Sequence, residues 1–93
     1  MKIFVSADIE GVAGIVDTNQ TLSPGSDYDL GRTLLLKEVN AAIDGAVAGG
    51  ATEIVVNDAH WRMQNLEPSA LTGNASGCVI ACSMTRSAGT GAE

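Results

Sequence analysis

The chain has 93 residues, of which 45% are hydrophobic, and a formal net charge of −6. This length allows one small domain at most, and the composition is sufficient for a packed core. The acidic balance argues against nucleic acid and anionic membrane surfaces as partners, because no basic patch is available to hold phosphates. No apolar run approaches the roughly 18 residues of a membrane-spanning helix, so we expect no membrane segment.

The first predicted element is a short apolar strand followed by two acids. Ile3, Phe4 and Val5 are consecutive rather than alternating, which indicates a strand buried on both faces. Asp8 and Glu10 follow one residue apart, so an extended chain presents both carboxylates on the same side. Two like charges held close need a cation between them or screening by water. We therefore expect a divalent-cation site or a solvated acidic loop, and the pair alone favours the loop.

A polar, turn-rich stretch at 17–29 predicts a surface loop, after which the pattern becomes helical from Leu30 to Val47. Asp27 or Asp29 is placed to cap the start of this helix, and Gly49-Gly50 is placed to end it. Apolar residues at helical spacing predict the face that packs on the core. They are Leu36, Val39, Ile43, Ala46 and Val47, with Leu35 and Ala42 widening the stripe.

A second strand is predicted from Thr52 to Asn57, again with consecutive β-branched residues. Strand, long helix and strand make a βαβ unit, whose crossover is right-handed and whose strands are parallel. We therefore predict an α/β fold built on a parallel βαβ unit. Because one helix covers only one face of the sheet, the other face needs further helices or a partner chain.

The carboxyl ends of neighbouring parallel strands meet at one edge of the sheet. Asp8 and Glu10 follow the first strand, and Asn57, Asp58 and His60 follow the second. Two carboxylates and an imidazole at one place are a ligand set for zinc or a similar transition metal. This convergence favours a metal-binding His60 over an unliganded loop histidine. For Asp58 we favour a turn-forming or helix-capping acid, and for Asn57 a side chain that bonds the loop backbone. The alternative for both is orientation of the His60 ring.

The last third of the chain carries weaker signals. Pro68 is placed to open a short helical turn through Leu71, and Cys78 to Cys82 are compatible with a third strand. The C-x-x-x-C spacing is neither the redox C-x-x-C pattern nor half of a zinc ribbon. We expect two reduced thiols, as in a cytoplasmic protein.

Four segments, read together, resemble a known family. They are S-A-D-I-E-G at 6–11, G-R at 31–32, E-V-N-A-A-I at 38–43 and V-N-D-A-H at 56–60. In order and spacing, over residues 2–72, they resemble the amino-terminal part of the D-aminopeptidase (DppA) family of zinc peptidases. The resemblance implies a two-zinc centre with Asp8, Glu10 and His60 among its ligands. It also implies removal of the N-terminal residue from small peptides, D-amino-acid peptides included, and assembly into large ring-like homo-oligomers.

The resemblance also implies that part of the family's site is missing. The family's further metal ligands, a histidine and a glutamate, and its catalytic histidine lie beyond this length, and His60 is the only histidine here. We therefore expect an amino-terminal fragment that is inactive alone, with its catalytic residues unassigned. Residues 1–75 would be the βαβ part of a larger three-layer α/β domain, and residues 76–93 an unassigned tail.

Two other functions are compatible with the residues. The first is a non-catalytic βαβ domain that binds metal or serves in assembly. The second is a magnesium-dependent phosphoryl-handling domain built on Asp8 and Glu10, since magnesium favours carboxylates. The absence of a phosphate-binding glycine loop disfavours the second.

Overall fold

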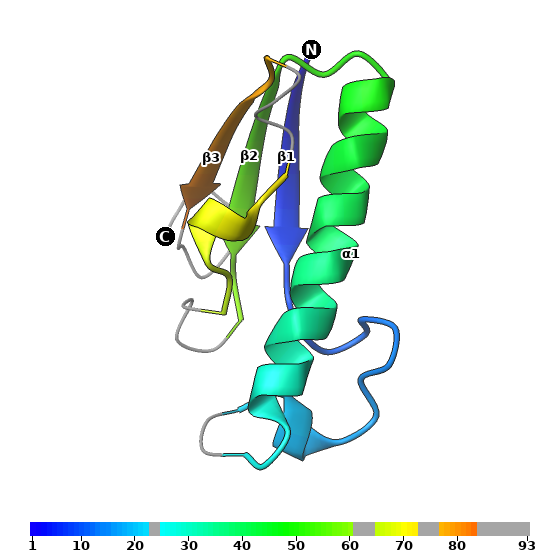
Figure 1. The fold of residues 1–93 in the computed structure, drawn as a ribbon, viewed down its shortest axis with the longest axis vertical. Helices are drawn as coiled ribbons and strands as arrows, with labels where there is room; N and C mark the ends of the chain where they lie inside the picture. The colour runs from blue at the N-terminus through cyan, green and yellow to red at the C-terminus, as the bar shows by residue number, and fades with distance from the viewer. Residues whose placement is uncertain (23–24, 61–64, 73–76, 84–93) are drawn as a thin grey trace.

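A computed structural model describes residues 1–22, 25–60, 65–72 and 77–83. These residues form a three-stranded parallel sheet, in the order β1-β2-β3, with one long helix packed along it (Figure 1). The strands are β1 (Lys2–Ala7), β2 (Glu53–Asp58) and β3 (Val79–Ser83), and the helix is α1 (Tyr28–Ala48). Two short 3-10 helices, η1 (Thr18–Gln20) and η2 (Pro68–Ala70), lie in the connections. The predicted α/β fold with a parallel βαβ unit is confirmed.

All three strands point the same way, so their carboxyl ends share one edge of the sheet (Figure 1). Residues Ser6 and Asn57 are register partners near this edge, as are Ala7 and Asp58. The segments that follow β1 and β2 leave the sheet at this end, where η1 also lies. Groups about 50 residues apart in the sequence are thereby brought to one place.

The buried residues of helix α1 are spaced four apart, namely Gly31, Leu35, Val39 and Ile43. Leu35, Val39 and Ile43 belong to the hydrophobic core, whereas Gly31 lies against the backbone of Gln20. The stripe is centred on Leu35 rather than on the predicted Leu36, which is only half-buried. Asp27 is the N-cap residue, although its side chain makes no capping hydrogen bond. The helix ends at Ala48 with Gly49 as its C-cap, and Gly50 takes the positive φ of 102° that glycine tolerates best, so the predicted stop is confirmed.

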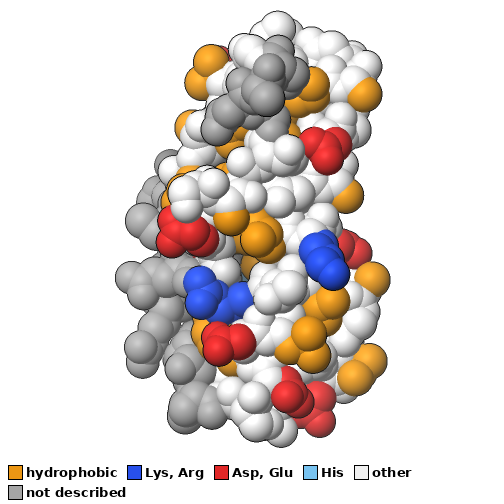
Figure 2. Space-filling view, in the orientation of Figure 1, with side chains coloured by type: hydrophobic (Ala, Val, Ile, Leu, Met, Phe, Trp, Pro, Cys, Tyr) orange, Lys and Arg blue, Asp and Glu red, His pale blue; other side chains and the backbone are white. Residues whose placement is uncertain are grey.

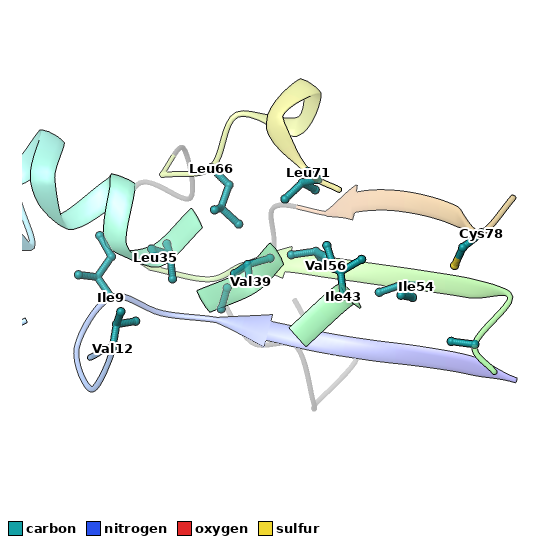
Figure 3. Packing of buried hydrophobic residues seen from close by; sticks show 12 residues of the cluster. Ile9, Val12, Leu35, Val39, Ile43, Ile54, Val56, Leu66, Leu71 and Cys78 are labelled. Carbon is teal, nitrogen blue, oxygen red and sulfur yellow. The ribbon is translucent and has the colours of Figure 1, made fainter. Parts of the chain in front are cut away.

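The core lies between α1 and one face of the sheet, as Figure 3 shows. Ile43, Ile54 and Val56 are fully or almost fully buried there, and Ile9 and Val12 extend the cluster past the end of β1. The opposite face of the sheet is less covered. Phe4, which is 51% exposed, lies in one cross-strand row with the half-buried Val55 and the exposed Ala81.

The prediction that the first strand is buried on both faces is therefore wrong for this chain, because Phe4, on the face away from α1, is 51% exposed. The exposed fraction alternates along β1: Ile3 and Val5 are half-buried, whereas Lys2, Phe4 and Ser6 are exposed. A sheet covered on one face only was the expectation drawn from the single helix, and the exposure of Phe4 agrees with it.

The remaining predicted elements are found within a residue or two. The second strand runs one residue later than expected, the turn at Pro68 is the helix η2, and the third strand is shifted by one residue to Val79–Ser83. The predicted surface loop at 17–29 contains η1 and the first two residues of α1. The division of the chain at residue 75 stays a prediction, since β3 follows it and residues 84–93 lie outside the described part. Among the described residues, no helix combines the length and apolar character needed to cross a membrane.

Candidate metal centre

Asp8 and Glu10 sit just past the end of β1, where the buried side chain between them fixes their direction. Ile9 is completely buried in the core. Its neighbours Asp8 and Glu10 consequently point outward, with side chains 59% and 63% exposed. Burial of one apolar residue thus holds two carboxylates together at the carboxyl edge of the sheet, as predicted, although Ile9 and Glu10 lie in a bend and a turn rather than in the extended segment that was expected.

His60, which follows β2, brings its imidazole to these two carboxylates. Nδ1 lies 2.6 Å from Asp8 Oδ1 and 3.0 Å from Glu10 Oε1, and the ring itself is only 6% exposed. One ligand atom from each of the three residues lies within 4.8 Å of the other two. The three residues predicted to converge are therefore together in the structure.

The second ring nitrogen of His60 faces the backbone of the loop before α1. Nε2 lies 2.5 Å from the carbonyl oxygen of Thr21, a residue that is itself buried. A carbonyl oxygen can only accept a hydrogen bond, so this contact requires a hydrogen on Nε2. A neutral imidazole in that state offers an unprotonated Nδ1 to whatever lies between the carboxylates.

The donor set fits a divalent cation of the transition series. Two carboxylate oxygens and an imidazole nitrogen lie within 4.8 Å of one another, and all three can ligate a metal ion. Two carboxylates held this close repel each other unless a cation or a proton lies between them. Imidazole suits zinc and its neighbours, whereas magnesium and calcium take oxygen ligands. Because His60 is almost fully buried while both acids are exposed, the cluster is open to solvent on the carboxylate side.

Asp58 lies behind the cluster and organises the chain that follows it. Its carboxylate accepts hydrogen bonds from the Asn65 backbone N–H (2.7 Å), the Leu66 backbone N–H (2.8 Å) and Asn65 Nδ2 (2.9 Å). Asn65 Nδ2 also donates to the His60 carbonyl oxygen at 2.6 Å. The described contacts thus connect Asp58 with the backbone of His60 through Asn65. Asn57 is fully buried beside it in β2, and a part for either residue in orienting the His60 ring stays a prediction.

Sequence reasoning did not find Thr21 or Asn65, which contact the His60 ring and the His60 backbone, respectively. Thr21 acts through its backbone carbonyl, which carries no signature of residue type. Asn65 lies in a stretch without helical or strand periodicity. The G-R pair at 31–32 was the sequence feature that could have indicated Asn65. Arg32 Nε donates a hydrogen bond to the Asn65 carbonyl oxygen at 3.0 Å, so α1 contacts this loop.

A cavity of about 260 Å³ opens beside the cluster. Glu10 and Thr21, which both contact His60, also line it, together with the apolar side chains of Ile15 and Val16. One exposed acid of the cluster, Glu10, thus borders a partly apolar cavity.

A parallel α/β unit whose strand ends carry two carboxylates and a buried imidazole defines a class of protein with a candidate metal centre at the sheet edge. Comparison with known proteins identifies the family within that class. A family model described as D-aminopeptidase matches residues 1–84, so the chain belongs to the D-aminopeptidase family.

Two proteins illustrate the relationship. A curated D-aminopeptidase of Bacillus subtilis (strain 168) is 39% identical over 66 residues, which are 71% of this chain and 24% of that protein. The solved structure described as "Zn-dependent D-aminopeptidase DppA from Bacillus subtilis, a self-compartmentalizing protease" matches with a TM-score of 0.79 and 33% identity, over 88% of this chain and 28% of that one. The chain thus spans about a quarter of the length of each of these relatives.

Proposed function

We propose that this chain carries the zinc-binding edge of a D-aminopeptidase-like peptidase that hydrolyses the N-terminal residue of small peptides, including D-amino-acid peptides. The observation that supports this most directly is the cluster of Asp8, Glu10 and His60, whose ligand atoms lie within 4.8 Å of one another. Zinc is favoured over magnesium by the imidazole and by the zinc dependence named for the solved relative.

In this proposal, Asp8 Oδ1, Glu10 Oε1 and His60 Nδ1 hold the metal. Zinc, when bound, supplies Lewis acidity that polarises a carbonyl and makes a water nucleophilic near neutral pH. The two exposed carboxylates also bring negative charge to the mouth of the site, where the free α-ammonium group of a peptide would be attracted. The adjacent cavity, with Ile15 and Val16 in its wall, is of a size to receive one small side chain.

We further propose that the 93-residue chain alone is inactive or nearly so. Peptide hydrolysis needs a general base and a group that stabilises the oxyanion, and neither is assigned among the described residues near the cluster. The chain also spans only 24% and 28% of its two relatives. The further groups are expected from chain outside these 93 residues or from neighbouring subunits.

Assembly into a homo-oligomer belongs to the same proposal. It is supported by the word self-compartmentalizing in the description of the solved relative, and by Phe4, half exposed on the uncovered face of the sheet. A cytoplasmic location, with a small peptide as substrate, completes the proposal. The cytoplasm is supported by Cys78 and Cys82, which are both free thiols.

Calorimetric titration with zinc tests the metal site. Wild type is compared with Asp8→Ala and His60→Ala, and with Asp44→Ala as a control that removes an exposed acid from α1, away from the cluster. We expect wild type and the control to bind with equal affinity and both site variants to lose binding. Absence of binding in wild type, or binding unaffected by His60→Ala, contradicts the proposed site.

A peptidase assay tests the second part of the proposal. With a D-Ala-initiated peptide and zinc, we expect little or no turnover by the chain alone. Robust turnover that is abolished by a chelator would show that the chain is a complete enzyme and would refute the proposed dependence on further groups. Zinc binding without turnover under any assembly condition would favour the alternative, a non-catalytic metal-binding or assembly domain.

A further inference from the structure

The imidazole of His60 is held from both sides, and the two sides differ in chemistry. Nδ1 faces the carboxylates of Asp8 and Glu10, whereas Nε2 faces the Thr21 carbonyl oxygen at 2.5 Å. A nitrogen that donates its hydrogen to a carbonyl has no lone pair for a metal ion. The Thr21 carbonyl therefore determines which nitrogen is available, and it leaves Nδ1.

The Thr21 carbonyl can fix the ring only if its own position is fixed, and the preceding segment supplies this. The Thr21 hydroxyl and backbone N–H both donate to the Thr18 carbonyl oxygen, at 2.8 Å and 3.0 Å. The Gln20 side chain, itself buried, accepts from the backbone N–H groups of Val16 (2.7 Å) and Asp17 (2.9 Å). Its Nε2 donates to the Gly14 carbonyl oxygen at 3.0 Å. Helix η1 and its flanks thus form one hydrogen-bonded unit ending at Thr21.

This unit is seated on α1 at Gly31. A Cβ atom at this position would overlap the carbonyl oxygen of Gln20 and lie 2.9 Å from its carbonyl carbon. Gly31 is buried within the helix and has no positive φ, so close approach of the Gln20 backbone, not helix conformation, is what excludes a side chain here. Gln20 directly precedes Thr21, so any displacement at this contact moves the carbonyl that faces His60.

We propose that Gly31 is a positioning residue for the metal centre. Through the Gln20 backbone it sets the Thr21 carbonyl, which holds the His60 ring with Nδ1 directed between the two carboxylates. The orientation of the ring stands on this geometry alone, and its consequence for zinc rests on the proposed function. The close approach of the Gln20 backbone thus gives a physical reason for the glycine in the G-R pair at 31–32.

The chain offers a matched pair of variants for the test. Gly31→Ala places a methyl group against the Gln20 carbonyl, whereas Gly45→Ala places one on the same helix with nothing within 4 Å. Alanine favours the helix over glycine equally at both positions, so the difference between the variants isolates the contact. Gln20→Ala is the second variant, since it removes the hydrogen bonds around η1 without introducing a clash.

The readout is nuclear magnetic resonance of the imidazole nitrogens, which is unambiguous because His60 is the only histidine. In the absence of metal, exchange of the Nε2 hydrogen with water reports the hydrogen bond to the Thr21 carbonyl oxygen. We expect slow exchange in wild type and Gly45→Ala, and exchange roughly tenfold faster in Gly31→Ala and Gln20→Ala, as for loss of one hydrogen bond. Free exchange in wild type, or equal exchange in all folded variants, overturns the proposal.

The same samples are then titrated with zinc. We expect zinc to shift the Nδ1 resonance of wild type while the Nε2 hydrogen stays in place, and Gly31→Ala to bind zinc roughly 10-fold or more weakly than Gly45→Ala. Coordination through Nε2 overturns the proposed orientation. A protected Nε2 hydrogen in a wild-type chain that does not bind zinc would instead refute the proposed function and leave the positioning of His60 intact. If Gly31→Ala fails to fold, the wild-type and Gln20→Ala spectra decide the question.

Discussion

Replacing Asp58 tests whether the carboxylate behind the candidate site holds the loop that carries it. Asp58 is 1% exposed and accepts three hydrogen bonds, two of them from the backbone N–H groups of Asn65 and Leu66. In Asp58→Ala these two buried N–H groups lose their acceptor, at about 1–3 kcal/mol each. We expect a loss of about 3–5 kcal/mol. A chain of 93 residues has roughly 5–14 kcal/mol of stability in total, so this is a large fraction of it.

Urea unfolding followed by circular dichroism measures the loss. Asp58→Asn keeps one acceptor oxygen and places an amide group against the remaining donors, so we expect an intermediate loss of about 1–3 kcal/mol. Asp44→Ala, at an exposed position on α1, serves as the control and should change stability by less than about 0.5 kcal/mol. A loss below about 1 kcal/mol in Asp58→Ala would refute the reasoning, because it would mean that water replaces the carboxylate as acceptor.

Three further predictions address the core, the uncovered sheet face and a thiol. Ile43→Ala, at a completely buried position on α1, should lower the free energy of unfolding in urea by about 2–5 kcal/mol. Leu30→Ala, at a half-exposed position on the same helix, should lower it by less than about 1 kcal/mol, and equal losses would contradict the described core. Phe4→Ser should reduce the average mass seen in sedimentation with little loss of helix signal, and an unchanged mass would exclude the exposed sheet face as an assembly surface. Burial, and secondarily the charge of Asp58, raises the pKa of the Cys82 thiol. The alkylation rate of Cys82 should therefore reach its midpoint at a higher pH in the folded chain than in urea, and coincident midpoints would contradict this.

The order and type of the elements could be predicted because their signals are local. A continuous apolar run, a helical stripe and a glycine pair are readable within a few residues, and the strands and helix they predict are found almost in place. The predicted burial of β1 on both faces failed for the opposite reason. A run such as Ile3-Phe4-Val5 shows that a strand is apolar, but whether each of its faces is buried depends on what other parts of the molecule pack there. Here α1 packs on one face of the sheet, and Phe4 on the other face is exposed.

The convergence of Asp8, Glu10 and His60 was predictable from topology rather than from contact. Parallel strands must end at one edge, so residues that follow two adjacent strands meet without any sequence signal for the meeting itself. What topology cannot supply is orientation. The two groups that hold His60 from the other side are the Thr21 carbonyl and the Asn65 side chain, and a backbone carbonyl looks the same at every residue.

The first turns of α1 contact both segments that hold His60, the one ending at Thr21 and the one containing Asn65. This explains why Gly31 and Arg32, which are distant in sequence from the strand ends, belong with the site. Gly31 receives the Gln20 backbone and so sets the loop that contacts the His60 ring. Arg32, the next residue, donates to the Asn65 carbonyl oxygen, while the Asn65 side chain donates to the His60 carbonyl oxygen. Acidic and basic side chains are interspersed with hydrophobic ones over the face seen in Figure 2, so charge pattern alone does not single out this pair. The role of Gly31 and Arg32 follows from their position on the helix, because successive helical residues point toward different neighbours. Gly31 contacts the backbone of Gln20, and Arg32 contacts the backbone of Asn65.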